Sequence, residues 1–508
     1  MFLRAFFRVH AMLCFITSQE QKRKTGDSLI ESPVLFSGKG EKKMEAVIGK
    51  ILGDLGTFLF GPIMLAVFFG VGLYFTIRLR GVQFTRFGTA FREVVGNVGK
   101  KTDDGIGQIR SYKALATALS SCVGNGNIVG VAYAIAVGGP GAIFWMWVAA
   151  LGGMATKFAE IALAMHFRIQ DEDGNFRGGV MYILTRGMKH KTIARILGGA
   201  FAVFTVFVSV VSCGALQVNT INSAVSGFVG NTTVIPWIVA ILILVVDGLV
   251  IFGGVRKISD VTTFLTPIMA LIYLGFGLVI LIMNITLIPQ ALWFIVKSAF
   301  TGDAVIGGVA GATMGIAIRR GVQRGVFSNE AGTGSSAMVH ATAKVDVPVK
   351  QALYGIIEVF FDTFVICTFT ALIVMVSGVW NSGVTDGTVL ASTAFRQNLG
   401  GLGQVVIVIS LILFCLSTVL GWYTYGESAF AFLFGTHRVK IYRVLHMVIC
   451  ALGALISVQL LWDAADVCNG LMAIPNLFSL ILFGGIVVKD TKDFFADYDH
   501  TQSGGRAK

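Results

Sequence analysis

Two glycine-rich strings interrupt apolar stretches of the sequence, and both could hold a small charged ligand. The first is Val-Gly-Asn-Gly-Asn at 123–127, and the second is the segment 319–334, which contains three arginines and Glu330. Glycine costs about 1 kcal/mol in a helix interior relative to alanine, so we expect the helices to unwind there. Freed N–H groups can bind a carboxylate, and freed carbonyls can bind sodium. Close helix packing at the first string and a re-entrant hairpin at the second also fit these residues.

Single polar residues in other apolar stretches are further candidate ligands. Gln217 lies in Ser-Cys-Gly-Ala-Leu-Gln-Val-Asn-Thr, where its amide could bind a ligand or bond across helices. Ser417 and Thr418 are adjacent hydroxyls that either bind a cation or bond to a carbonyl of their own helix. Lys157 and Glu160 are three residues apart, and we expect them to pair on one helix.

Isolated acids in apolar stretches are costly and usually functional. Each could relay a proton, bind sodium or neutralise a buried arginine. They are Asp247, Glu358, Asp362 and Glu427.

The composition excludes several classes of protein. Of the 508 residues, 55% are hydrophobic and 13% are charged, and the mean hydropathy is +0.77. Soluble domains carry about 25% charged residues, and disordered chains have low hydrophobicity, so neither class fits. The seven cysteines form no CxxC pair, and the chain has neither an HExxH zinc motif nor a GxxxxGK[ST] phosphate loop. We therefore expect no enzyme, no resident cofactor and no ATP-driven pump.

Long apolar runs predict an all-α membrane protein with about eleven spanning helices, because each span needs about 20 apolar residues. The interrupted runs 304–318 and 327–343 count as one span. After a single first span near 56–77, five spans are followed by five more, and each half opens with one glycine-rich string. This symmetry places a first repeat at about 111–287 and a second at about 304–488. Glycine-broken spans at matching positions of two halves are typical of a transporter binding site.

Basic residues predict the orientation of these spans. The net charge is +12, and lysines and arginines concentrate in alternate loops, which indicates cytoplasmic loops of a cytoplasmic-membrane protein and no nucleic-acid partner. The C-terminus, including the tail 491–508, is then cytoplasmic and the N-terminus is outside. Residues 1–43 contradict this rule with eight lysines and arginines. We therefore interpret them as an extension that precedes a transporter domain at 44–490.

Five longer strings carry a resemblance that covers about 56–490. The chain resembles the alanine/glycine:cation symporter family, and the resemblance implies a LeuT-type five-plus-five inverted repeat with one extra span in front. In that fold the first and sixth repeat helices are broken. The strings are GGPGAIFWMWVAALGGM at 138–154, GVQRGVFSNEAGTGSSA at 321–337, FFDTFVICTFTAL at 360–372, LSTVLGWYTYGE at 416–427 and ADVCNGLMAIPNL at 465–477.

The resemblance also implies which residues bind the ligands. Asn125 departs from the family, where the first string is usually similar to Val-Gly-Thr-Gly-Asn, which affects substrate preference. The substrate site then comprises Asn125, Gly126, the matching Gln217, and an unwound segment of Gly325, Val326, Phe327 and Ser328. GTGSSA at 332–337 replaces the commoner GMGSAP and adds polarity near the pocket. Sodium would be held by Ser120, Val123, Asn127, Ser417 and Thr418.

We therefore expect a symporter in the lipid bilayer that imports alanine or glycine with sodium. A proton-coupled carrier of the same fold, with Asp362 or Glu427 as the relay, is an alternative. A channel subunit is a further alternative, but the sequence has neither charged rings nor a continuous polar helix face.

Overall fold

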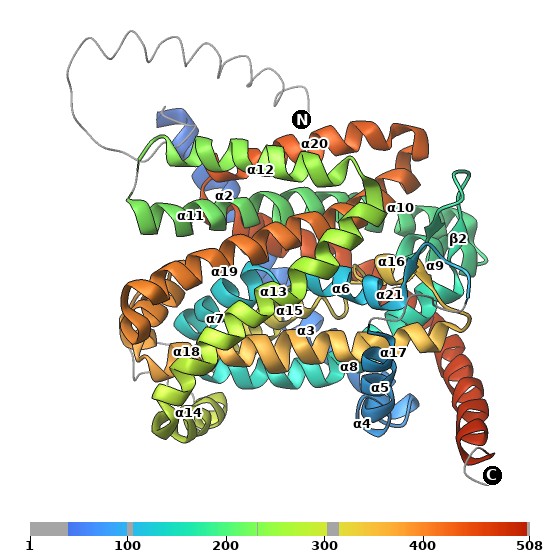
Figure 1. Cartoon of the computed structure of the whole chain (residues 1–508). Coiled ribbons are helices and arrows are strands. Elements are labelled where there is room, and N and C mark those ends of the chain that lie inside the picture. Colours follow the sequence, from blue (N-terminus) through green and yellow to red (C-terminus); the bar gives the residue numbers. More distant parts are fainter. Residues whose placement is uncertain (1–38, 99–104, 231, 302–313, 505–508) are drawn as a thin grey trace.

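The computed structural model describes residues 39–98, 105–230, 232–301 and 314–504, and these are mostly helical (Figure 1). Residues 1–38, which make up most of the predicted N-terminal extension, lie outside the described residues. So does 304–313, at the predicted start of the second repeat.

The first half begins with two helices that meet at a bend, α2 and α3. A short amphipathic segment follows them and precedes the first glycine-rich string. Its helices are α2 (Lys39–Leu59), α3 (Pro62–Arg78), α4 (Val82–Thr85), α5 (Phe87–Asn97), α6 (Ser111–Cys122), α7 (Val131–Gly138), α8 (Gly141–His166), α9 (Val180–Gly187), α10 (Lys191–Phe207), α11 (Leu216–Val229), α12 (Ile235–Ile251), α13 (Gly254–Met283) and α14 (Ile288–Thr301). Two π-helical segments, η1 (Gly126–Gly130) and η2 (Val208–Ala215), join α6 to α7 and α10 to α11.

The second half ends in two long helices. Its helices are α15 (Met314–Asn329), α16 (Ala337–His340), α17 (Pro348–Val359), the π-helix η4 (Phe360–Cys367), α18 (Thr368–Val376), α19 (Gly387–Phe434), α20 (Val439–Leu452) and α21 (Val458–Gly504). Gly400 kinks α19 at a positive φ of 59°. The stretch before Gly400 is helical from Gly387 on.

The described helices are long and apolar enough for six membrane spans, or up to eight if each bent pair is one span. Helices α12 and α14 are shorter apolar helices. The protein is therefore a multi-pass membrane protein, and the count of eleven spans stays a prediction.

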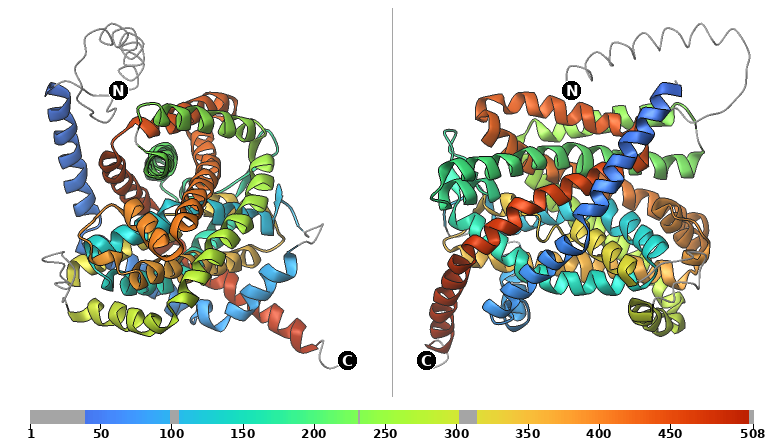
Figure 2. Two further views of the ribbon diagram at one scale, coloured as in Figure 1. Left: turned by 60° about the vertical axis from the view of Figure 1, so that its left-hand side comes forward. Right: turned by 180° about the vertical axis from the view of Figure 1, so that it is seen from behind.

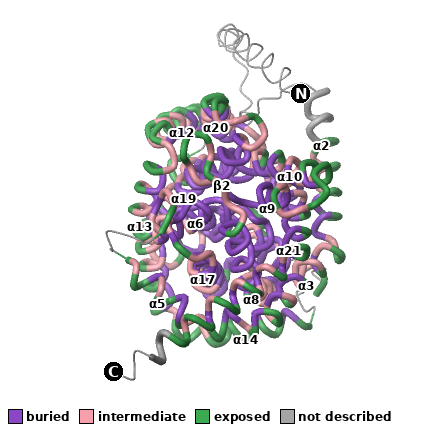
Figure 3. Tube along the Cα trace, turned by 90° about the vertical axis from the view of Figure 1, so that its right-hand side faces the viewer, coloured by how far each residue is buried: buried purple, intermediate pink, exposed green. Residues whose placement is uncertain are grey.

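Burial follows the pattern of a protein surrounded by lipid rather than water. Large apolar side chains are exposed on the outer helices, among them Leu249, Phe264 and Leu271, which are 66%, 71% and 73% exposed. Buried residues fill the centre of the bundle (Figure 3), and many polar and charged residues are among the buried ones. Polar groups inside a membrane protein normally pair with one another or mark a ligand pathway, so the centre is where a site is expected.

Helix α8 is the centre of the packing and contacts α3, α15 and α17. Glycines permit this close approach, because a Cβ on Gly72 of α3 would lie 2.9 Å from the Cα of Gly152 in α8. Helix α2 crosses the back of the bundle beside α21 (Figure 2, right). The packed helices enclose two broken segments. One is the α6–α7 pair, and the other is the segment between α15 and α16.

Two short β-ladders interrupt the predicted all-α architecture. Strand β1 (Ile109–Arg110) runs parallel to β4 (Ala343–Lys344), so the start of α6 is joined to the chain that follows α16. Strand β2 (Ile169–Gln170) is antiparallel to β3 (Phe176–Arg177). We call the side of the molecule with the β1–β4 ladder the ladder face. The opposite face contains Gly138, the last residue of α7.

Arg168 fastens the β1–β4 ladder to the end of α8. Its Nη1 and Nη2 atoms donate to four backbone carbonyls at 2.8–3.3 Å. These carbonyls belong to Ile106, Ala341, Ala343 and Val345. The guanidinium therefore connects the segments that precede the first broken helix and follow the second.

The C-terminal end of α21 projects beyond the bundle (Figure 1), and Arg86 contacts it near its last turns. Arg86 donates two hydrogen bonds to Asp499, at 2.8 and 2.6 Å, and lies 4.2 Å from the centre of the Phe495 ring. The hydrogen bond from Arg86 lowers the pKa of Asp499 below its usual value.

Candidate substrate and cation site

The first helix break occurs where the sequence predicted it. Helix α6 ends at Cys122, Val123 has an extended backbone with ψ of 90°, and the flanking helices meet at a 50° bend. A Cβ on Gly124 would lie 2.4 Å from the Oγ1 of Thr418 and 3.3 Å from the Nε2 of Gln217. Glycine at 124 thus lets the broken backbone touch two other candidate residues at once.

The second break lies further along the chain than predicted. Helix α15 continues through Gly325, Val326, Phe327 and Ser328 to Asn329, so the expectation that these four residues are unwound is wrong. The non-helical segment is 330–336, where the backbone takes positive φ at Glu330 (58°), Gly332 (93°) and Gly334 (75°). Two glycines that tolerate positive φ set the break, whereas Gly325 stays helical.

Two residues of that predicted segment do not face the centre. Gly325 lies against α8, where a Cβ would be 3.2 Å from the Cγ of Met146. Val326 packs with Leu65 of α3 and Val322. In these positions a small or branched apolar residue serves helix packing.

An amide pair joins the first break to α11. The Oε1 of Gln217 accepts from the backbone N–H of Asn125 at 3.1 Å, and its Nε2 donates to the Asn125 Oδ1 at 2.9 Å. The Asn125 amide also donates to Thr220 at 3.0 Å. Phe327 of α15 lies against the first break, because a Cβ on Gly126 would be 3.0 Å from its ring. Four predicted substrate residues therefore meet at one place.

Ser328 and Asn127 are linked through a buried acid. Ser328 donates to both oxygens of Asp362, at 3.0 and 2.8 Å, and Asn127 donates to Asp362 Oδ1 at 2.6 Å. The Oδ1 of Asn127 meanwhile accepts from the Gly124 N–H at 3.0 Å. Asn127 therefore caps the break with its carbonyl oxygen and contacts Asp362 with its amide nitrogen.

The remaining predicted sodium ligands form a compact oxygen cluster. Thr418 Oγ1 lies 3.2 Å from the carbonyl oxygen of Ser120 and 3.3 Å from that of Val123. Ser417 Oγ lies 3.3 Å from the same Ser120 carbonyl. All of these residues are at most 1% exposed. Two carbonyls and two hydroxyls form the neutral oxygen set that suits a hard cation.

An aromatic layer separates the amide pair from the face opposite the ladder. Phe327 and Trp462 have ring centres 5.2 Å apart, and Trp462 stacks on Tyr133 at 6.5 Å. The Arg324 guanidinium lies 4.3 Å from the Trp462 ring and donates to Asp466 at 2.9 Å. Arg324 is one of the three arginines of the second glycine-rich string, and the sequence did not indicate its partner, which lies 142 residues away.

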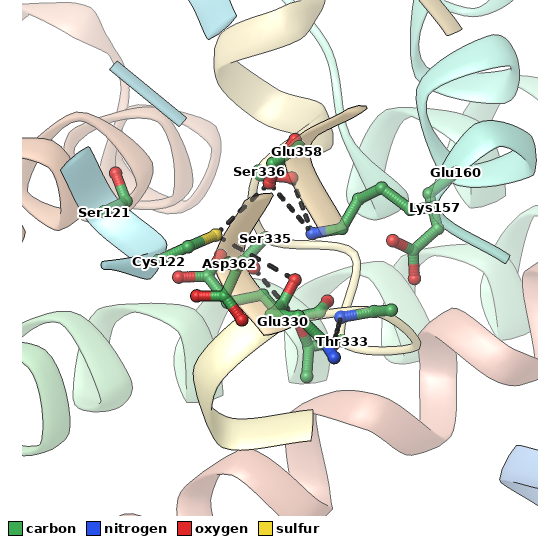
Figure 4. A network of polar contacts seen from close by, with 12 residues as sticks. Ser121, Cys122, Lys157, Glu160, Glu330, Thr333, Ser335, Ser336, Glu358 and Asp362 are labelled. Atoms are coloured by element: carbon green, nitrogen blue, oxygen red, sulfur yellow. Dashed lines mark hydrogen bonds and ion pairs between the residues drawn. The ribbon is translucent and has the colours of Figure 1, made fainter. Parts of the chain in front are cut away.

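A buried ion pair holds the second break in place (Figure 4). The Lys157 Nζ lies 3.2 Å from Glu358 Oε1 and donates to Ser336 at 2.8 Å. Glu358 also contacts His340 at 3.0 Å. The predicted pairing of Lys157 with Glu160 is wrong, because Glu160 turns to the second break instead. It accepts hydrogen bonds from the backbone N–H groups of Gly332 and Gly334 and from Asn476.

Local helix distortions, which hydropathy does not reveal, lie beside the site. Each of the three π-helical segments in the described part of the chain contains a site residue or ends within two residues of one: Asn127 lies in η1, Gln217 follows η2 by two residues, and Asp362 lies in η4. π-Helical turns often occur at functional sites because the extra residue redirects side chains.

Apolar helices around a polar centre, with two facing breaks and a cluster of neutral oxygens, define a multi-pass membrane transporter. The sequence profile of the sodium:alanine symporter family matches residues 44–506. The chain therefore belongs to this family, as its sequence resemblance indicated.

Individual proteins agree with this assignment. The chain is 41% identical to the sodium/alanine symporter AgcS of Methanococcus maripaludis over 447 residues, which are 87% of this chain and 96% of AgcS. It is 37% identical to the amino-acid carrier protein AlsT of Bacillus subtilis over 452 residues, covering 89% and 93% of the two chains. Its fold is similar to that of MhsT, solved in complex with L-phenylalanine, with a TM-score of 0.51 and 12% identity. That match covers 77% of this chain and 99% of MhsT.

Proposed function

We propose that the protein is a sodium-coupled symporter that imports alanine or glycine across the cytoplasmic membrane by alternating access. One observation carries this proposal: the first break contacts the Gln217 amide and the Thr418 hydroxyl at the same residue, Gly124. A change at either ligand site therefore moves the backbone of the other. The names of AgcS and AlsT support the class of substrate, and the name of AgcS supports the ion.

In this proposal the amino acid binds between Asn125 and Gln217. Its carboxylate replaces the Gln217 Oε1 as acceptor for the Asn125 N–H, and the released amide orients the ligand. Gly126 and Phe327 limit the size of the side chain, because the ring lies almost against the glycine. A small substrate such as alanine or glycine suits this space.

Sodium binds between the Ser120 and Val123 carbonyls and the Ser417 and Thr418 hydroxyls. Each of these oxygens now takes part in a hydrogen bond across the break, and the ion replaces those bonds with direct ligation. Sodium therefore stabilises the broken backbone in the conformation that presents the Asn125 N–H to the substrate. This shared backbone is the proposed basis of coupling.

The proposed topology has eleven spans, one followed by two inverted five-helix repeats at about 111–287 and 304–488. The ladder face, with the C-terminal end of α21, is cytoplasmic, and the N-terminus is outside. The likeness to MhsT supports the fold, and the basic loops support the orientation.

A proton-coupled carrier is a second candidate because of Asp362. This acid contacts Asn127 at the first break and Ser328 at the end of α15, so its protonation would change both. Glu427 is a weaker relay candidate. It lies in a cavity of about 250 Å³ on the ladder face, and Tyr423 donates a hydrogen bond to it.

Uptake by the purified protein in sealed liposomes tests the proposal. We expect saturable uptake of radiolabelled alanine that requires an inward sodium gradient and is unaffected by a proton gradient alone. Uptake driven by protons without sodium would support the second candidate. Non-saturable flux without either gradient would indicate a channel.

A further inference from the structure

A cavity of about 250 Å³ lies on the ladder face, and the residues of the central site do not line it. Gln108 and Thr342 do line it, and the N–H of Gln108 donates to the Thr342 carbonyl at 2.8 Å beside the ladder. The other walls come from β3, α16, the start of α13, α19 and α20. The cavity therefore borders the chain after the second break on one side and helices α13 and α20 on the other.

Three arginines from three separate elements line this cavity. They are Arg177 of β3, Arg256 of α13 and Arg443 of α20. Arg256 has neither an ion pair nor a hydrogen bond within the part of the chain that the structure describes. Arg177 uses its Nε for Asp171 at 2.5 Å, and Arg443 uses its Nε for the Tyr423 hydroxyl at 3.2 Å. The terminal nitrogens of both guanidiniums therefore remain available to a ligand.

The nearby acids do not balance these three positive charges. Glu427 is the one acid among the described residues that line the cavity, and it accepts a hydrogen bond from Tyr423 rather than from an arginine. Asp171 is already paired with Arg177. One guanidinium is thus left without a counter-ion, and like charges around one space repel each other. An anionic ligand in the cavity would remove this repulsion.

Neutral donors face the same space. Ser428 lines the cavity and is 8% exposed, yet its hydroxyl has no hydrogen-bond partner among the described residues. Gly254 and Val255, the first two residues of α13, also line it, and no side chain caps this 30-residue helix. The first turn of a helix presents free N–H groups and a partial positive charge. Guanidiniums, free N–H groups and a hydroxyl are together the donors that bind a phosphate group.

We propose that this cavity binds a phosphate group, either inorganic phosphate or the headgroup phosphate of an anionic lipid, and that the bound group holds the ladder face shut. Arg256, Arg443 and the start of α13 bind its oxygens, and Ser428 donates to it. The phosphate then bridges the chain after the second break to α13 and α20. The inference goes beyond the proposed symport, because this ligand regulates the carrier and is not transported.

The first test measures equilibrium binding of radiolabelled inorganic phosphate to the purified chain in nanodiscs of phosphatidylcholine, a lipid without net charge. Arg256→Gln removes a charge from an exposed side chain that has no partner to lose, so the variant should fold normally. Ser428→Ala removes the hydroxyl. Lys257→Gln is the matched control, because this neighbouring base donates to the Leu249 carbonyl and does not line the cavity.

We expect one phosphate per wild-type chain, bound at least about tenfold more weakly by Arg256→Gln and by Arg443→Gln. Ser428→Ala should have a smaller effect and Lys257→Gln none. Phosphatidylglycerol that copurifies with the chain identifies the source of the phosphate group. Arg256→Gln should lose one bound lipid if the headgroup is the occupant, and no lipid if free phosphate is.

The second test measures efflux of preloaded alanine from liposomes that hold phosphate on both sides, compared with gluconate at equal ionic strength. Phosphate should slow efflux from the wild-type chain and not from Arg256→Gln. Phosphate binding that leaves efflux unchanged would overturn the link to the ladder face.

The site itself is overturned if the wild-type chain binds no phosphate, or if Arg256→Gln and Arg443→Gln bind it as tightly as the wild type. Equal weakening by Lys257→Gln would also overturn it, since any surface charge would then suffice. Failure of the proposed function looks different, because no alanine would then enter or leave the liposomes, whereas phosphate binding would still be measurable.

Discussion

Replacing Thr418 by valine tests the cation cluster with little change of shape. The substitution exchanges one hydroxyl for a methyl group at a residue that is 1% exposed. The hydroxyl lies within 3.3 Å of the Ser120 and Val123 carbonyls, so its removal takes one of four neutral oxygens from the proposed sodium site. Thr418→Ser keeps the oxygen and loses only the methyl group.

The expected magnitude follows from the loss of one polar ligand. A buried polar group left without its partner costs about 1–3 kcal/mol, which corresponds to a roughly 5- to 150-fold weaker sodium affinity. Alanine uptake at saturating sodium should change much less, because a high ion concentration refills the weakened site.

The assay is alanine uptake into liposomes across a series of external sodium concentrations. Thr205→Val is a matched control, since Thr205 is also fully buried but bonds to the Phe201 carbonyl of its own helix at 2.8 Å. We expect the half-saturating sodium concentration to rise for Thr418→Val but not for Thr418→Ser or Thr205→Val. Slower uptake with unchanged sodium dependence would refute the reasoning and make Thr418 a packing residue.

Three further substitutions test other parts of the structure. Gln217→Ala leaves the Asn125 N–H without its acceptor and should raise the half-saturating alanine concentration roughly 5- to 150-fold without preventing insertion. An unchanged half-saturating concentration would mean that Gln217 is not part of the substrate site. Arg168→Gln releases four carbonyls at the ladder and should speed efflux of preloaded alanine about tenfold, whereas equal efflux would limit Arg168 to a role in folding. Asp499→Asn should free the end of α21, seen as faster trypsin cleavage there. Equal cleavage of both chains at neutral pH would mean that the ion pair does not hold the helix.

The sequence predicted the elements that carry strong local signals. Gly124 and its neighbours indicated the first break, because two glycines and two asparagines are poor residues for a membrane helix. Gln217, Ser417 and Thr418 were recognisable as polar residues among apolar ones. The structure places all of them at the same break, in agreement with the resemblance.

Other features depend on tertiary contacts that no local pattern contains. The break after α15 depends on Gly332 and Gly334, whereas the nearby Gly325 serves packing, and composition alone does not distinguish these roles. Lys157 pairs with Glu358 on another helix although Glu160 is close in sequence, since the latter carboxylate is taken by backbone N–H groups. The π-helical segments are likewise set by packing and are invisible in hydropathy.

The β1–β4 ladder has a consequence for the speed of the transport cycle. Its direct bonds include the N–H of Gln108 to the Thr342 carbonyl at 2.8 Å and the Ser111 hydroxyl to the Lys344 carbonyl at 3.2 Å. Each bond contributes about 0.5–1.5 kcal/mol net, so the whole strap amounts to a few kcal/mol. In the proposed alternating-access cycle, such a strap would keep the ladder face shut for most of the time, and collective motions of this kind occur within microseconds to milliseconds. Most of these contacts are made by the main chain, whereas the side chains of Ile109 and Ala343 are buried in the core beside the ladder, so substitutions there would act through packing.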